Sequence, residues 1–164
     1  MIIQIRVDDR LIHGQVAVLW SKHFGTSHMV VANDAAATNE VQKMTLKMAT
    51  PPGVKVLIKN VEESINLFND ERSKKIKLFV LTDTIQDALK IAQNCEVQSI
   101  NVANVGRFDK SENQIKINSN ISCNTKEFEA LKEVSKLNIE TIQWIIPAHA
   151  KVSIEKLLEK YKEE

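Results

Sequence analysis

The sequence is poor in the residue patterns that several common enzyme classes require. It holds only four glycines in 164 residues, so neither Gly-x-Gly-x-x-Gly nor a P-loop can be written, which argues against a nucleotide-binding enzyme. It lacks Cys-x-x-Cys, His-x-x-x-His and His-Glu-x-x-His, which argues against a zinc site, and Gly-x-Ser-x-Gly, which argues against a serine hydrolase. We therefore expect neither a metal ion nor a cofactor.

An excess of one charge is also lacking. The chain carries 22 basic and 21 acidic residues, a formal net charge of +1, and this balance gives no bulk attraction to nucleic acid or to an anionic membrane. Aromatic residues make up only 5%, without the basic-aromatic alternation of a single-strand binding platform. We expect no nucleic-acid partner, and an acidic ligand must be met by a local basic site.

Long apolar runs and paired cysteines are absent as well. No apolar segment approaches the length that spans a membrane, and the N-terminus enters a predicted strand rather than a cleavable leader. Cys95 and Cys123 lie far apart and are expected to be free thiols. We expect a cytoplasmic chain that folds as one domain over residues 1–164, with 43% hydrophobic residues to form its core.

Short β-branched runs alternate with amphipathic runs along most of the chain. Because several strands are almost continuously apolar, the pattern predicts an α/β fold: a single-domain, open, mainly parallel sheet with helices on both faces. A polar segment at 107–117 is predicted as a loop or small hairpin inserted into this alternation. Predicted strands are 2–7, 28–32, 55–58, 76–81, 99–103 and 140–146; predicted helices are 15–24, 39–49, 61–69, 85–94, 126–137 and 154–162.

The segment with the clearest chemistry follows the first predicted strand. There Asp8-Asp9-Arg10-Leu11-Ile12-His13-Gly14-Gln15 places a histidine three residues after an arginine on a strand-to-helix turn. Free N–H groups at the helix start, around Gly14 and Gln15, suit an anion. A neutral imidazole is a nucleophile and an arginine offsets phosphoryl charge, so the turn predicts phosphoryl transfer without a metal. Asp8 and Asp9 can each bind the imidazole N–H or the arginine.

Further polar residues follow the other strands, where ligands of open α/β sheets bind. Asn33-Asp34 follows the second strand, and the segment from Asn104 to Arg107 follows the fifth. For Asn33 and Asp34 two interpretations stay open. They either close the strand through side-chain-to-backbone hydrogen bonds or take part directly in the site.

The stretch from Arg6 to Val16 resembles the active-site segment of the IIB component of the mannose/fructose/sorbose-type sugar phosphotransferase system (PTS). The resemblance continues in the family's order at Val31-Ala32-Asn33-Asp34, at the run from Met48 to Lys55, at Asn104-Val105-Gly106 and at Pro147, so it covers nearly the whole chain. One position departs from the pattern. Such proteins commonly have a second glycine after Asn-Val-Gly, and here Arg107 occupies it.

The resemblance implies a phosphocarrier, a protein-phosphohistidine–sugar phosphotransferase at the cytoplasmic side of a membrane transporter. It would accept a phosphoryl group from the phosphohistidine of a IIA component onto Nδ1 of His13 and pass it to a sugar held by the membrane components IIC and IID. Arg10 would contact the phosphoryl oxygens, and Asp8 would support the loop or the imidazole. The resemblance leaves the sugar undetermined and allows a homodimer. The accessory candidates are Arg6, Asp9, Asn33, Asp34 and Arg107.

Two other functions stay open at this level. Asp8-Asp9 after the first strand could form the acidic pocket of a receiver-type regulatory domain, although Lys59-Asn60 stands where that fold needs an acceptor aspartate. A protein-binding module without chemistry is the third interpretation. Phosphate chemistry separates them, because phosphohistidine is acid-labile and alkali-stable, an acyl phosphate is labile to both, and a binding module takes up no phosphate.

Overall fold

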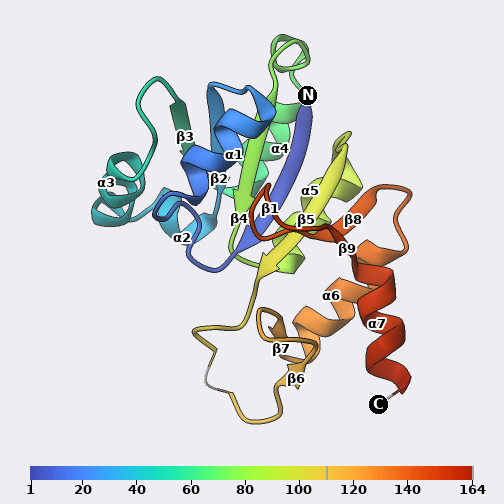
Figure 1. Ribbon diagram of the computed structural model, residues 1–164. Coiled ribbons are helices and arrows are strands. Elements are labelled where there is room, and N and C mark those ends of the chain that lie inside the picture. The colour runs from blue at the N-terminus through green and yellow to red at the C-terminus, as the bar shows by residue number, and fades with distance from the viewer. Residues whose placement is uncertain (110, 164) are drawn as a thin grey trace.

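A seven-stranded sheet, in the order β3-β2-β4-β1-β5-β8-β9, forms the centre of the protein (Figure 1). The computed structural model describes residues 1–109 and 111–163. Within them the strands of this sheet run parallel except β9, which pairs antiparallel with β8. The strands are β1 (Ile2–Asp8), β2 (His28–Ala32), β3 (Lys55–Lys59), β4 (Leu78–Thr82), β5 (Ser99–Asn104), β8 (Glu140–Gln143) and β9 (Val152–Ser153).

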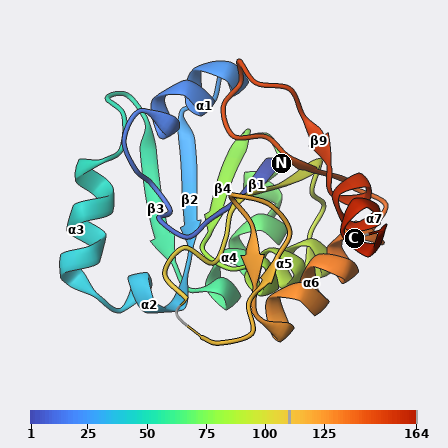
Figure 2. The ribbon, with the colours of Figure 1, turned by 60° about the horizontal axis from the view of Figure 1, so that its bottom comes forward.

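Helices cover both faces of the sheet (Figure 2). One buried cluster joins the sheet to α4, α5, α6 and α7, and a second joins it to α1, α2 and α3, so the sheet has a hydrophobic core on each side. This arrangement confirms the predicted α/β class. The helices are α1 (Val16–Phe24), α2 (Asp34–Ala37), α3 (Glu40–Met48), α4 (Val61–Asn69), α5 (Ile85–Asn94), α6 (Thr125–Ser135) and α7 (Ile154–Glu163), with a 3₁₀ turn, η1 (Glu71–Ser73).

β1 lies in the middle of the sheet, between β4 and β5. All seven of its residues are buried, which explains why its sequence is apolar except for Gln4, Arg6 and Asp8. Because β4, β1 and β5 run parallel, the segments that follow them emerge at one edge of the molecule. The loop from β1 to α1 therefore leaves the sheet at the centre of its carboxyl edge, where such folds bind ligands.

Several predicted boundaries are wrong by one to three residues. β4 begins at Leu78 rather than Ile76, because the Ile76 N–H donates to Ser73 in the turn that follows η1. β8 ends at Gln143 rather than Ile146, because the Trp144 N–H donates to the side chain of Asn101 and so leaves the ladder. The short elements α2, η1 and β9 were not predicted, since two to four residues carry no readable periodicity.

The insertion is a hairpin, but its second strand lies beyond the predicted range of 107–117. β6 (Ile115–Lys116) pairs antiparallel with β7 (Ser122–Cys123). The turn is closed by Asn118, whose Oδ1 accepts the N–H groups of Asn120 and Ile121 at 2.9 and 3.0 Å. Residues 107–109 and 111–114 form the irregular part of the insertion, and Lys110 lies outside the described residues.

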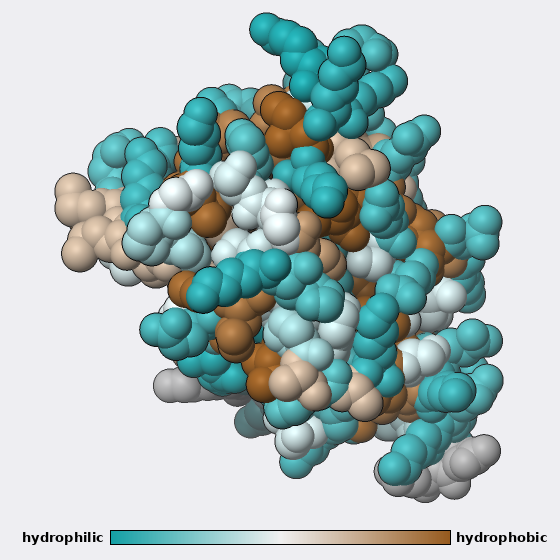
Figure 3. All heavy atoms as spheres, turned by 45° about the horizontal axis from the view of Figure 1, so that its top comes forward, coloured by the Kyte–Doolittle hydropathy of each residue, from teal (hydrophilic) through white to brown (hydrophobic). Residues whose placement is uncertain are grey.

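Within the described residues, no helix combines the length and the apolar character that crossing a bilayer requires. The face at the amino ends of the strands is largely hydrophilic, with a pale brown projection on the left where α3 lies (Figure 3). The helix α3 exposes Val41, Met44 and Met48, while Leu46 on its opposite side is buried.

Candidate functional site

The loop between β1 and α1 is held in place by two buried apolar side chains. Leu11 and Ile12 are 4% and 5% exposed and belong to the same core cluster as Trp20 of α1. Leu11 has a positive φ of 58°, a conformation that costs a non-glycine residue free energy, and its N–H donates to the carbonyl of Asp8 at 2.9 Å. This tight turn brings His13, two residues after Leu11, back toward Asp8 at the end of β1.

The imidazole of His13 turns toward Asp8 and is 17% exposed. Its Nε2 lies 2.9 Å from Asp8 Oδ2. A carboxylate only accepts, so Nε2 carries the proton in the neutral ring and Nδ1 keeps its lone pair. Among the described residues, none forms a hydrogen bond with Nδ1. The ring is therefore fixed through one nitrogen, and the other is left for chemistry.

Asp8 is fully buried and is surrounded by donors. Oδ2 accepts, besides the imidazole, Nη2 of Arg6 at 3.3 Å and Nδ2 of Asn104 at 3.1 Å, while Oδ1 accepts the backbone N–H of Arg10 at 3.0 Å. Burial alone would raise the pKa of Asp8, but the hydrogen bonds from His13 and Arg10 and the charge of Arg6 together lower it below its ordinary value. Asp8 is thus a carboxylate at neutral pH.

Arg6 lies beneath Asp8 and is only 1% exposed. Its Nη1 donates to the carbonyl of Trp144 at 3.1 Å, and its guanidinium carbon lies 5.6 Å from the centre of the Trp20 ring. A buried cation of this kind needs a buried anion, and Asp8 supplies it. Arg6 therefore acts from below, by fixing the carboxylate, rather than by facing a substrate.

The side chain of Arg10 has the opposite character. It is exposed, and within the described part of the chain its guanidinium forms no hydrogen bond or ion pair. Only its backbone N–H is engaged, by Asp8. The cation is therefore available to an incoming anion three residues before His13.

The start of α1 lacks a side-chain cap. Gln15 is the N-cap residue, and its side chain accepts no hydrogen bond from the helix, whereas α2 to α6 are each capped by an asparagine or threonine side chain. The helix begins at Val16, one residue later than the sequence suggested. Gly14, with a φ of 49°, precedes the cap. The N–H groups of the first turn of α1 thus lack a side-chain acceptor, as expected for a site that takes an anion.

The accessory candidates divide into two groups. Asp9 Oδ2 accepts the backbone N–H of Arg107 at 2.8 Å, so this pair ties the insertion to the β1–α1 loop. Asn33 caps α2 through the N–H of Ala36, and Asp34 accepts the N–H of Val61 at 2.9 Å. Both residues therefore make the side-chain-to-backbone bonds of turn residues, and a direct role in the site stays a prediction.

Sequence reasoning did not single out Asn104 as a site residue, although it noted the segment that this residue begins. Asn104 ends β5, is 5% exposed and bonds both to Asp8 and to the insertion. Asp8 and Asn104 are 96 positions apart in the chain, and only the pairing of β1 with β5 brings them together. No pattern within one segment could have indicated this contact.

Carboxylates gather beside the site, at the start of α5. Glu127 of α6 is 8% exposed and accepts the Ile85 N–H. Burial, with the charges of Asp83 and Asp87, raises its pKa to about 7, and burial raises the pKa of Asp87 to about 6. These groups hold protons at mildly acidic pH.

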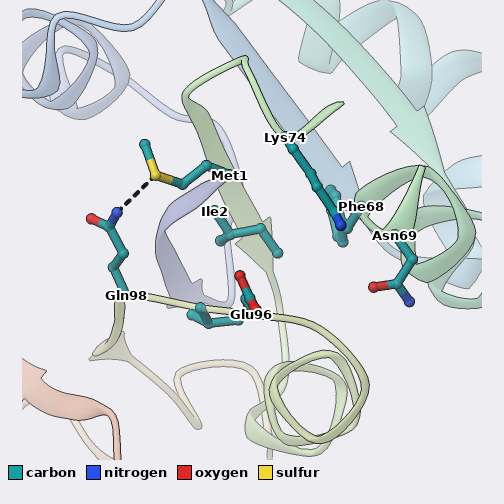
Figure 4. A pocket seen from close by; sticks show the side chains of 8 residues that line it. Met1, Ile2, Phe68, Asn69, Lys74, Glu96 and Gln98 are labelled. Carbon is teal, nitrogen blue, oxygen red and sulfur yellow. Dashed lines mark hydrogen bonds between the residues drawn. The ribbon is translucent and has the colours of Figure 1, made fainter. Parts of the chain in front are cut away.

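A separate hollow of about 350 Å³ opens at the amino edge of the sheet (Figure 4). Met1, Phe68 and Gln98 line it, together with the oppositely charged Lys74 and Glu96. It lies at the end of the strands opposite to His13 and contains no nucleophile that the sequence pointed to. The β1–α1 loop, which carries His13 and Arg10, is therefore the candidate site.

Comparisons with known proteins agree on one family. A family model described as "PTS system sorbose subfamily IIB component" matches residues 2–164. The chain is 46% identical over 162 residues to a probable phosphotransferase enzyme IIB component from Streptococcus pyogenes, with 96% of this chain and 99% of the relative covered. It is 31% identical over 136 residues to the PTS mannose-specific EIIAB component of Escherichia coli, covering 82% of this chain and 41% of that longer protein.

The fold is similar to that of a solved structure as well. The crystal structure of the IIBSor domain of the sorbose permease from Klebsiella pneumoniae superposes with a TM-score of 0.88, covering 98% of this chain and 97% of that one. The two sequences are 24% identical in this superposition, so the likeness concerns the fold.

Proposed function

The chain belongs to the sorbose subfamily of PTS IIB components, and we propose that within this family it is a phosphocarrier whose acceptor atom is Nδ1 of His13. Membership makes it a phosphotransferase component of sugar transport. The observation that carries the proposal is the 2.9 Å contact between His13 Nε2 and Asp8, which commits one ring nitrogen and leaves the other with its lone pair.

The first transfer is an exchange between two imidazoles. The lone pair of His13 Nδ1 attacks the phosphorus of a phosphohistidine on a IIA donor, a new P–N bond forms, and the donor's P–N bond breaks. The electron pair of that bond stays on the donor imidazole, which takes up a proton from solvent water. The bond order to phosphorus is low in such a loose transition state, so positioning and charge stabilisation carry the catalysis.

Asp8 and Arg10 have separate roles in this step. Positive charge develops on the His13 ring as Nδ1 bonds to phosphorus, and the Asp8 carboxylate beside Nε2–H stabilises it. Arg10, exposed and without a partner among the described residues, contacts the phosphoryl oxygens. The N–H groups near Gly14 and Gln15, at the uncapped start of α1, bind the remaining charge.

The second transfer delivers the phosphoryl group to a sugar. A sugar hydroxyl oxygen attacks phosphorus, the bond to Nδ1 breaks with its electron pair returning to the ring, and the hydroxyl proton passes to solvent water. The membrane components IIC and IID hold the sugar, so the protein works at the cytoplasmic side of the membrane. The name of the E. coli relative joins A and B components in one chain, which supports a IIA component as the donor. Light scattering tests whether the protein forms the homodimer that the family resemblance allows.

Labelling by a radioactive phospho-IIA component tests the proposal. His13→Ala should abolish the label, whereas His149→Ala, a change at an exposed histidine, should leave it intact. The label should be acid-labile and alkali-stable. A label that survives His13→Ala refutes the assignment, lability to both acid and alkali favours the receiver interpretation, and no label on the wild-type protein favours a binding module.

A further inference from the structure

The side chain of Asn104 is oriented by its neighbours in only one way. Its Oδ1 accepts Nδ2 of Asn120 at 2.9 Å and Nη2 of Arg107 at 3.4 Å. Its Nδ2 donates to Asp8 Oδ2 at 3.1 Å. Because Arg107 only donates and an ionised Asp8 only accepts, the reversed amide would lose both of these contacts. The carboxamide thus connects the insertion, through its oxygen, to Asp8, through its nitrogen.

The backbone fixes Asn104 at the same point. The register of β1 against β5 shifts between Val7 and Asp8, so that Asp8 lies opposite Asn104 rather than opposite Ala103. The N–H of Asp9 donates to the Asn104 carbonyl at 3.0 Å. Asn104 thus contacts the end of β1 through both its backbone and its side chain, and it is 5% exposed.

Asp8 Oδ2 accepts from three donors, the Arg6 guanidinium, the His13 imidazole and the Asn104 amide. Arg6 approaches it at 3.3 Å, Asn104 at 3.1 Å and His13 at 2.9 Å. With two of these donors fixed in the sheet, the carboxylate cannot turn away from the imidazole. If Asn104 Nδ2 is removed, Arg6 is the one donor of the sheet left on Oδ2, and besides it only the Arg10 N–H on Oδ1 and the imidazole hold the carboxylate, so its orientation toward His13 is less tightly fixed.

We propose that Asn104 is a positioning residue for phosphoryl transfer: it holds Asp8 so that the proton of His13 stays on Nε2, and Asn120 holds Asn104. This inference rests on the proposed role of His13 and deepens it. The consequence is that the insertion after β5, although distant in sequence, helps to decide which tautomer the nucleophile adopts.

Nitrogen-15 NMR of the His13 ring tests this directly, because it reports the tautomer without any transfer reaction. In the wild-type protein the neutral ring should be the Nε2–H form. Asn104→Ala should give a mixture with the Nδ1–H form and slow transfer from phospho-IIA about tenfold, the factor that one hydrogen bond to a charged group supports. Asn120→Ala should act in the same direction and more weakly.

Asn60→Ala is the matched control. Asn60 follows β3 at the same edge of the sheet and caps α4 through the N–H of Glu63, so its loss removes a hydrogen bond without touching Asp8. In Asn60→Ala, the tautomer of the His13 ring and the rate of transfer from phospho-IIA should equal those of the wild-type protein. An unchanged tautomer in Asn104→Ala overturns the inference, even if transfer is slower, while a wild-type protein that takes up no phosphoryl group overturns the proposed function instead.

Discussion

The pair of His13 and Asp8 illustrates how a residue's neighbours decide its chemistry. An isolated histidine has two similar ring nitrogens, and the 2.9 Å contact from Nε2 to Asp8 makes them different. The sequence indicated that Asp8 or Asp9 could bind the imidazole or the arginine, and the structure gives the imidazole to Asp8. It could not indicate Arg6, Asn104 and the Trp144 carbonyl as a connected support, since the last two come from β5 and from the segment after β8.

Arg10 is a clear test at this scale, because its side chain supports no part of the fold among the described residues. Arg10→Ala should lower the transfer rate from phospho-IIA by about a hundredfold, since it removes a cation that acts on the transition state. The free energy of unfolding should change by less than about 0.5 kcal/mol. Stopped-flow transfer and urea unfolding measure the two quantities.

Arg72→Ala is the control for that change. Arg72 is an exposed arginine of η1 that pairs with Asp70 at 2.8 Å, far in the sequence from the β1–α1 loop. The Arg72→Ala protein should accept the phosphoryl group at the wild-type rate. Equal rates for Arg10→Ala and Arg72→Ala would remove Arg10 from the mechanism.

At the scale of elements, the order of strands and helices was predictable and the contacts between distant loops were not. The buried strands β2 and β4 are almost continuous apolar runs, so their existence follows from composition. The end of β8 was misplaced because the side chain of Asn101 replaces the next ladder partner. A side-chain acceptor that takes the place of a backbone acceptor arises only when the sheet is packed, and it leaves no periodic pattern in the sequence.

Gly106, two residues after the end of β5, lies against the backbone of the hairpin strand β7. Its φ is 87°, and a Cβ built there would lie 2.0 Å from the backbone oxygen of Ser122 in β7. Gly106→Ala should therefore destabilise the protein by about 3 kcal/mol or more, because backbone must move. Gly25→Ala is the matched control: its φ is 61°, no atom lies within 4 Å of the added carbon, and about 1 kcal/mol is expected. Similar losses in urea unfolding would contradict the close approach.

At the scale of the whole molecule, the central position of β1 explains why the site and the fold share residues. Arg6 and Asp8 are both buried in the middle strand, with a hydrophobic core on each side of the sheet. The support of the imidazole is therefore as rigid as the core itself. The expectation of one domain over residues 1–164 predicts a single cooperative unfolding transition.

Glu127 links this stability to pH. Burial raises its pKa to about 7 from an ordinary value of 4.5, so the folded protein keeps a proton that the unfolded chain releases. Its contribution is fully present below about pH 4.5 and is lost as pH rises through about 7. Relative to the wild type, Glu127→Gln should gain stability between pH 5 and pH 8, by about 1–2 kcal/mol, measured by urea unfolding at each pH.

Glu129→Gln is the control for this pH dependence. Glu129 is exposed on the same helix, where it pairs with Lys132. Its stability should follow the wild-type curve at every pH. If the curves of Glu127→Gln and the wild type run parallel from pH 5 to pH 8, Glu127 does not retain its proton in the folded state.

The most direct test of the central claim is the site of the phosphoryl group in the phosphorylated protein. Phosphorus-31 and nitrogen-15 NMR on protein labelled in its histidine rings should show one phosphohistidine, at His13, with the P–N coupling on Nδ1 and the proton retained on Nε2. A phosphoryl group on Nε2, the nitrogen that Asp8 holds at 2.9 Å, or on any other residue would contradict the account.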